Sequence, residues 1–312
     1  MSVTFSGGIT FTGGGFSFTP PPPPPSGNKA IFGYGFGSGF TAITNLVSNA
    51  GVVANDTAGV GTARNSLAAA GYGTDKAIFG YGYNSVGPGY RSMTNLVSNT
   101  GVVATDTTGV GSARSDLAAA GYGTDKAIFG YGSGPTAVTN KVSNTGVVAT
   151  DTTGVGTARY SLAAASYGTD TAIFGYGYYN GYLSMTNTVS NTGVVASDTT
   201  GVGTARLYLA AAGYGTDKAI FGYGAASSGF VSLTNLVSNT GVVATDTTGV
   251  GTARRLLAAA VYGTDKAIFG YGYNSAEERV SLTNLVSNTG VVATDTTGVG
   301  TERDGLAAAA YG

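Results

Sequence analysis

One heptapeptide, Lys-Ala-Ile-Phe-Gly-Tyr-Gly, occurs six times almost unchanged in this chain of 312 residues. The starts of successive copies are separated by 47, 50, 45, 47 and 48 positions. A repeat of this length is typical of propellers, solenoids and arrays. We therefore expect one repetitive domain over residues 29–312, preceded by a segment of different character over residues 1–28. The copies begin at Lys29, Lys76, Lys126, Thr171, Lys218 and Lys266.

Each copy contains four short segments with β-strand character, as the second copy illustrates. These segments are 76–82, 93–98, 102–107 and 117–122. The turn Asn99-Thr100-Gly101 tolerates the positive φ that a tight hairpin requires. Four short strands in one repeat make a blade of a β-propeller. The predicted fold is all-β: a six-bladed β-propeller with a short N-terminal β/polyproline extension.

The fourth segment of each copy, Leu-Ala-Ala-Ala-Gly-Tyr or a close variant, is also compatible with a helix, because Ala and Leu have high helix propensity. We favour a strand, since so short an isolated helix is only marginally stable. The last of these segments, 306–311, is then expected to pair with 29–35 and complete the first blade. Without that pairing a sheet edge would stay open.

The composition excludes several classes of function. The chain has no Cys and no His, so disulfides, Cys/His zinc sites and catalysis by either residue are ruled out. Its net charge of -1 offers no attraction for nucleic acid or for an anionic membrane. The sequence contains neither a signal peptide nor an apolar run of the roughly 18 residues that span a bilayer. We expect no cofactor, no enzymatic activity, no nucleic-acid partner and no membrane insertion.

Residues 1–28 differ from the repeats. Alternating runs of β character at 3–5, 9–12 and 16–19 precede six consecutive prolines, Pro20 to Pro25. Such a proline run adopts polyproline II and forms a semi-rigid spacer about 20 Å long. We interpret the segment as an anchor that docks onto other subunits, because tails that stay disordered are usually poor in aromatic residues. A disordered tail is the alternative.

Two charged residues recur in every copy: an Asp in the third segment and an Arg eight positions later. Calcium loops supply several oxygen ligands at alternating positions, and this stretch does not. Sixfold repetition also argues against an active site. We therefore predict a structural role, in which the Asp accepts hydrogen bonds from turn N–H groups or from the Arg, and metal binding is the weaker alternative. The pairs are Asp56 and Arg64, Asp106 and Arg114, Asp151 and Arg159, Asp198 and Arg206, Asp246 and Arg254, and Asp295 and Arg303.

The copies differ mainly at two places. One is the stretch after each Phe-Gly-Tyr-Gly, such as 83–92 and 178–184, and the other is the residue pair after each Arg, such as Tyr160-Ser161. Because strands in a blade alternate in direction, both places should emerge on one face of the disc. The two constant turns, Tyr-Gly-Thr-Asp-Lys and Ser-Asn-Thr-Gly, should emerge on the other.

The variable face is the predicted recognition surface, since binding residues concentrate on loops that a rigid scaffold carries. Tyrosine suits such a surface because it combines a flat apolar ring with a hydroxyl group. The alternative is that the loops drift because nothing constrains them. The predicted ligand-binding residues are Tyr83, Tyr90, Tyr160, Tyr178, Tyr179, Tyr182 and Tyr208.

Two stretches resemble the repeat of kelch-type β-propellers. Residues 157–165 are similar to the kelch segment small-Arg-x-x-apolar-small-small, and residues 127–132 to its apolar-Tyr-apolar-Gly-Gly segment. The aromatic residue late in the kelch repeat, often Trp, is missing. The resemblance covers all six copies and implies a kelch-like propeller, but no particular function, since propellers have many roles. An enzyme of the galactose-oxidase type is a poor match, because its copper site needs His and Cys.

A second resemblance concerns the Gly- and Phe-rich start, the prolines and the phrase Gly-Thr-Asp-Lys-Ala-Ile-Phe-Gly-Tyr-Gly. These features look like those of uncharacterised proteins of marine tailed bacteriophages. The resemblance implies a virion surface or appendage protein that is assembled in the host cytoplasm. We therefore expect a non-enzymatic structural and adhesion protein, bound to other virion subunits through residues 1–28 and presenting its variable face to a glycan or host-surface receptor. A free lectin-like carbohydrate-binding propeller is the alternative.

Overall fold

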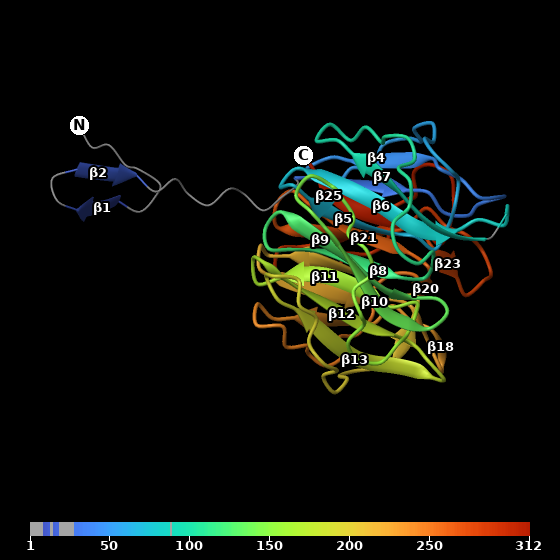
Figure 1. The fold of residues 1–312 in the computed structure, drawn as a ribbon. Helices are drawn as coiled ribbons and strands as arrows, with labels where there is room; N and C mark the ends of the chain where they lie inside the picture. The colour runs from blue at the N-terminus through green and yellow to red at the C-terminus, as the bar shows by residue number, and fades with distance from the viewer. Residues whose placement is uncertain (1–8, 13–14, 19–27, 88) are drawn as a thin grey trace.

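The computed structural model describes residues 9–12, 15–18, 28–87 and 89–312 (Figure 1). These residues form an all-β protein, and no helix among them has the length and apolarity to cross a membrane. Strands β1 (Ile9–Thr12) and β2 (Gly15–Phe18) form an antiparallel hairpin, at two of the three N-terminal runs predicted to have β character. The third run, 3–5, and the prolines 20–25 lie outside the described residues.

Six equivalent three-stranded antiparallel sheets form the framework of residues 28–312. In each sheet the strand of Lys-Ala-Ile-Phe-Gly lies between an Ala-rich strand and a strand that ends the variable stretch. One sheet consists of β5 (Ala68–Tyr72), β6 (Lys76–Tyr83) and β7 (Tyr90–Val97). The others are β25 (Ala307–Tyr311), β3 (Lys29–Gly33) and β4 (Thr44–Val47); β8 (Ala118–Tyr122), β9 (Lys126–Gly132) and β10 (Thr136–Val142); β11 (Ala163–Tyr167), β12 (Thr171–Tyr178) and β13 (Tyr182–Val189); β15 (Ala210–Tyr214), β16 (Lys218–Gly222) and β19 (Thr234–Val237); and β21 (Ala258–Tyr262), β22 (Lys266–Gly270) and β24 (Thr283–Val286).

The Ala-rich strands contact one another in a cycle, β25–β5–β8–β11–β15–β21 and back to β25. The last strand, β25, pairs with β3 near the start of the repeats, with Ala307 opposite Gly33 and Tyr311 opposite Lys29. The predicted pairing of the C-terminal segment with the first copy is therefore confirmed. As a result, the C-terminal strand β25 lies among the early strands β4, β5 and β6 (Figure 1).

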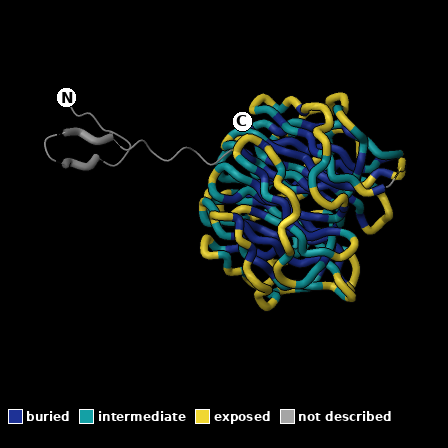
Figure 2. Tube along the Cα trace, viewed as in Figure 1, coloured by how far each residue is buried: buried dark blue, intermediate teal, exposed yellow. Residues whose placement is uncertain are grey.

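Small residues allow neighbouring sheets to pack closely. In β6, Ala77, Ile78 and Phe79 are fully buried, because sheets cover both of its faces. An added Cβ at Gly80 would lie 2.7 Å from the Phe129 ring of the next sheet, so only glycine fits there. The same Gly–Phe contact recurs around the cycle and ends with Gly270 against Phe32. Figure 2 shows the resulting buried interior beneath exposed loops.

The third segment of each copy was predicted to be a continuous strand, and the structure differs from this prediction. Residues 102–107 make only two isolated bridges to β7, Val97 with Val103 and Thr94 with Thr107. The register shifts by one residue between these bridges. There the buried Asn95 amide group donates to the Ala104 carbonyl (3.0 Å) and to the Asp106 carboxylate (2.9 Å). A side chain thus replaces part of the backbone ladder, which explains why the prediction of a strand over 102–107 was wrong.

Candidate recognition surface

The two variable places of each repeat meet at one end of the sheets. Ala68 in β5 lies opposite Gly80 in β6, so the pair after Arg64 and the stretch after Gly82 are neighbours. Asn65 and Tyr83 exchange two backbone hydrogen bonds there. Later repeats widen this contact into short strands: β14 (Arg206–Leu207) pairs with β17 (Ala225–Ala226), β17 with β18 (Gly229–Phe230), and β20 (Arg254–Arg255) with β23 (Tyr273–Asn274). We call the pairs after each Arg and the stretches after each Phe-Gly-Tyr-Gly the variable end.

The constant turns gather at the opposite end of the sheets, which we call the constant end. The Gly73 N–H donates to the Asp125 carbonyl of the next sheet at 2.7 Å. The Asn144 amide group donates to the Asp125 carboxylate at 3.1 Å, which joins the two constant turns of one sheet. Side chains and carbonyls of these turns therefore hold neighbours together, and this accounts for their near identity among the copies.

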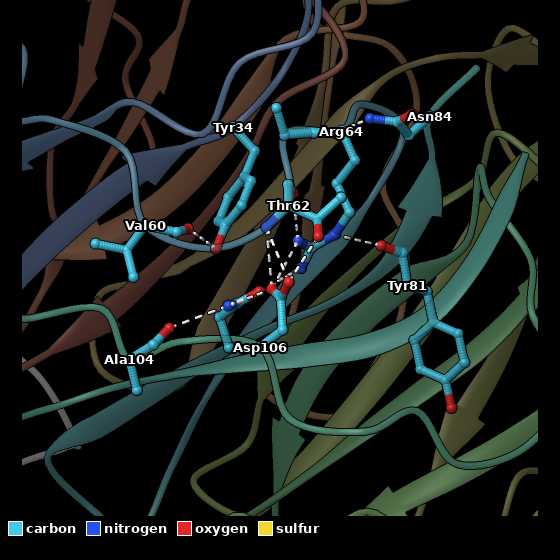
Figure 3. A network of polar contacts seen from close by, with 10 residues as sticks. Tyr34, Val60, Thr62, Arg64, Tyr81, Asn84, Ala104 and Asp106 are labelled. Carbon is cyan, nitrogen blue, oxygen red and sulfur yellow. Dashed lines mark hydrogen bonds and ion pairs between the residues drawn. The ribbon is translucent and has the colours of Figure 1, made fainter. Parts of the chain in front are cut away.

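The repeated Arg lies just beneath the variable end, where the chain crosses into the next sheet. Arg64 is fully buried. Its guanidinium group donates to the backbone carbonyls of Tyr81 (2.7 Å) and Thr62 (2.9 Å) and to the Asn95 side chain (2.7 Å). Asp106 lies 3.9 Å from it and accepts from both the N–H and the hydroxyl of Thr62 (Figure 3).

This arrangement agrees with the predicted structural role of the Asp and Arg series, with one difference. The Arg of one copy pairs with the Asp of the following copy, as Arg64 does with Asp106, because the crossing connection enters the next sheet. The Arg64 guanidinium also lies 4.4 Å from the ring centre of Tyr34 in the preceding sheet, a cation–π contact. Each Arg thus joins two sheets.

The hydrogen bonds of this network also decide the charge of the Asp. Burial alone would raise the pKa of Asp106, but hydrogen bonds from Thr62 and Asn95 and the nearby Arg64 outweigh it, and the pKa is lowered. The carboxylate therefore stays ionised and already has hydrogen-bond donors. Among the residues that the structure describes, no group of three or more acidic side chains has the arrangement of a metal site.

Five of the seven predicted tyrosines fall into two aromatic groups at the variable end, in different sheets. Tyr83 packs against Tyr90 with ring centres 5.9 Å apart, and Phe40 lies 6.0 Å from Tyr83. In the second group Tyr178 lies 5.7 Å from Tyr160 and 5.6 Å from Tyr182.

Exposure differs among these tyrosines. Tyr179, in the same loop as the second group, is exposed, as are Tyr83, Tyr90 and Tyr182. The seventh residue, Tyr208, is half-buried and lies apart, at the centre of the variable end.

Sequence reasoning missed the charged residues that occur once at the variable end. Arg255 lies over the ring of Phe230 (4.8 Å), and Arg279 lies over the ring of Phe36 (4.8 Å). Arg279 also pairs with the buried Asp304 at 3.4 Å. Burial raises the pKa of Asp304 despite the nearby arginines. The available signal was that these charges replace residues of other types at equivalent positions of the other copies.

Neither the known protein-family models nor the curated proteins contain a match to this chain.

Proposed function

We propose that residues 29–312 form a six-bladed, kelch-like β-propeller that serves as a non-enzymatic binding and structural protein, with the variable end as its recognition surface. Three features support a propeller: the cyclic contacts of the Ala-rich strands, the pairing of β25 with β3, and the Gly–Phe packing between all neighbouring sheets. The outer edge of each blade would be the segment that makes only isolated bridges.

One observation carries the proposed binding role: sequence differences among the copies collect at one end of an otherwise uniform framework. At the constant end, backbone groups of the turns bond between sheets and side chains join the two turns of a sheet, whereas the variable end displays aromatic and charged groups that differ from sheet to sheet. Loops that merely drift would favour small polar residues over grouped aromatic rings. Exposed tyrosines are typical of surfaces that bind glycans or proteins through several weak contacts.

The proposed setting is a virion surface or appendage, with residues 1–28 bound to other virion subunits and the variable end facing a glycan or host-surface receptor. The resemblance of the N-terminal segment and repeat phrase to phage proteins supports it. A free lectin-like propeller is the alternative. Mass spectrometry of purified virus particles separates the two, because only a virion component co-purifies with the particle in fixed stoichiometry.

The recognition surface is tested by replacing Tyr178, Tyr179 and Tyr182 together with Ser and measuring binding to a glycan array. We expect binding to fall while the melting temperature changes little, since these residues are at most half-buried. Val194→Ser is the matched control, because Val194 is 62% exposed in the same repeat but lies beside a turn of the constant end. Binding lost in the control and kept in the triple variant would place recognition at the constant end instead.

A further inference from the structure

A small cavity of about 80 Å³ lies where all six repeats meet at the variable end. Each repeat contributes the second residue of the pair after its Arg, together with the leucine that follows. Only Tyr208 among these residues was predicted to bind a ligand. The lining residues are Ser66, Leu67, Asp116, Leu117, Ser161, Leu162, Tyr208, Leu209, Leu256, Leu257, Gly305 and Leu306.

The backbone around this cavity is uniform, although the side chains are not. In each repeat the second residue of the pair after the Arg has a positive φ, and the six values lie between 51° and 59°. Each donates its N–H to the carbonyl of its equivalent in the preceding repeat, at 2.7–2.9 Å, and the cycle closes from Ser66 to Gly305. Backbone groups alone make this ring, so its side chains are free to differ. They are Ser, Asp, Ser, Tyr, Leu and Gly in chain order.

The cavity has an apolar inner part and a polar rim. The six leucines that follow the ring residues are each 5% exposed, and each directly precedes an Ala-rich strand. On the rim the Asp116 carboxylate accepts from the hydroxyls of Ser115 (2.7 Å) and Ser133 (2.9 Å). Burial and the nearby Asp116 charge raise the pKa of Tyr208, which keeps its phenol protonated.

One polar atom of the rim lacks a partner. Ser161 is 4% exposed, and its hydroxyl has no partner at hydrogen-bond distance among the described residues, although it lies near enough to the Tyr208 phenol to act against the rise of that group's pKa. Buried hydroxyl groups nearly always have a partner, because an unsatisfied one is destabilising. The Ser161 hydroxyl in the cavity lining therefore points to a ligand atom that hydrogen-bonds there.

We infer that this cavity binds the acetamido group of an N-acetylated amino sugar. The methyl group packs on the leucines, the amide N–H donates to the Asp116 carboxylate, and the carbonyl accepts from the Ser161 hydroxyl. A volume of about 80 Å³ holds roughly five water-sized groups, which suits an acetamido group but not a whole sugar ring. The sugar ring stays at the rim, beside Tyr208. This inference rests on the proposed role of the variable end in binding glycans.

The test compares three sugars on the full chain by calorimetry and ligand-observed NMR. N-acetylglucosamine is expected to bind, whereas glucose, which lacks the acetamido group, and glucosamine, which carries an ammonium group instead, are expected to bind at least tenfold more weakly. Equal binding of glucose would show that the cavity does not read the acetamido group. Tighter binding of glucosamine would show that Asp116 selects a cation, and either result overturns the inference.

Two conservative variants locate the site. Asp116→Asn removes the charged acceptor, and Asn tolerates the same positive φ, so we expect about 10–100-fold weaker binding with an unchanged melting temperature. Ser161→Ala removes one neutral hydrogen bond and should weaken binding about 3–10-fold. Val194→Ser is the control and should leave N-acetylglucosamine binding unchanged, because the exposed Val194 lies beside a turn of the constant end and does not line the cavity. Unchanged binding in Asp116→Asn and Ser161→Ala overturns the assignment.

Failure of this inference is distinguishable from failure of the proposed function. If the chain binds glycans that lack N-acetyl groups and the triple tyrosine variant loses that binding, the variable end remains the recognition surface and the cavity assignment is wrong. If neither cavity variants nor the triple variant change any glycan binding, both proposals fail.

Discussion

At the constant end, five of the six sheets offer the carbonyl of an Asp to a glycine N–H of the neighbouring sheet, and the first sheet offers that of Asn28. At the variable end the equivalent ring of backbone hydrogen bonds carries Ser, Asp, Ser, Tyr, Leu and Gly. Both ends close the same cycle. The difference is that side chains of the constant end bond to other turns, whereas the variable-end ring uses only backbone groups. A repeat can therefore change its residues at one end without losing its place in the cycle.

The largest effect is expected from opening the cycle. Deleting residues 304–312 removes β25, leaves one edge of β3 unpaired and takes away the Gly305 carbonyl that accepts from Ser66. Leu306 and Tyr311 are 5% and 2% exposed, and burying two such side chains contributes about 3–6 kcal/mol. Urea unfolding of the truncated chain measures the loss. A midpoint equal to that of the full chain would mean that β25 does not close the fold.

The next effect tests the framework beneath the variable end. Arg159→Ala removes a fully buried guanidinium group and leaves the Asn187 side chain and the Tyr176 carbonyl without their donor. Leaving each of these buried acceptors without its donor is destabilising by about 1–3 kcal/mol. Arg255→Ala is the comparison, because Arg255 belongs to the variable end and has no carboxylate partner within 4.0 Å among the described residues. Similar losses of unfolding free energy in both variants would remove the distinction between framework and loop arginines.

Low pH should lower the unfolding free energy by less than the deletion or the Arg159→Ala substitution. Burial would raise the pKa of Asp198, but hydrogen bonds from Thr157 and Asn187 outweigh it, so the folded-state pKa lies below the ordinary value of 3.8. The stabilisation is complete above that ordinary value and is lost as the pH falls through the lowered folded-state pKa. We expect the unfolding free energy to decrease below about pH 4. The unfolding free energy of Asp198→Asn, measured by urea titration, should decrease less steeply with falling pH across this range. An identical pH dependence in the variant and the unchanged chain would exclude the Asp198 carboxylate as a contributor to acid sensitivity.

The smallest effect is expected at Tyr179, three positions after the buried Tyr176. Tyr179→Ser should change the unfolding free energy by no more than about 0.5 kcal/mol, because Tyr179 is 43% exposed. Tyr176→Ser should cost about 3–5 kcal/mol, since Tyr176 is fully buried, packs edge-to-face against Phe221 and donates to the Val202 carbonyl. Thermal melts of the two variants measure the contrast. Comparable melting temperatures would show that the loop is as tightly packed as the framework.

Much of the architecture was predictable because six copies repeat one pattern. The spacing of the heptapeptide predicts equivalent sheets, and the order of segments in the last copy predicts that β25 pairs with β3. The outer segment was mispredicted, because its β-branched residues favour a strand and nothing local reveals that the Asn95 side chain takes over the ladder.

The candidate site was less predictable than the fold. Composition points to tyrosine at the variable end, but it cannot show that Tyr83 and Tyr178 belong to separate groups. Ser161 and Asp116 carry no signal of their own, since Ser and Asp are common in loops. They become notable only when the cyclic backbone brings equivalent positions of six distant repeats around one cavity.

Amide hydrogen exchange followed by NMR tests the closed cycle most directly, because it needs no substitution. The N–H groups of Ser66 and Gly312 bond across the junction between the two ends of the repeat region, to Gly305 and Asp75, and the N–H of Ser161 makes the equivalent bond between consecutive repeats. A closed cycle predicts that Ser66 and Gly312 exchange as slowly as Ser161, since protection reports local opening. Exchange of Ser66 and Gly312 at the rate of exposed loop amides, with Ser161 still protected, would contradict a closed ring of six repeats.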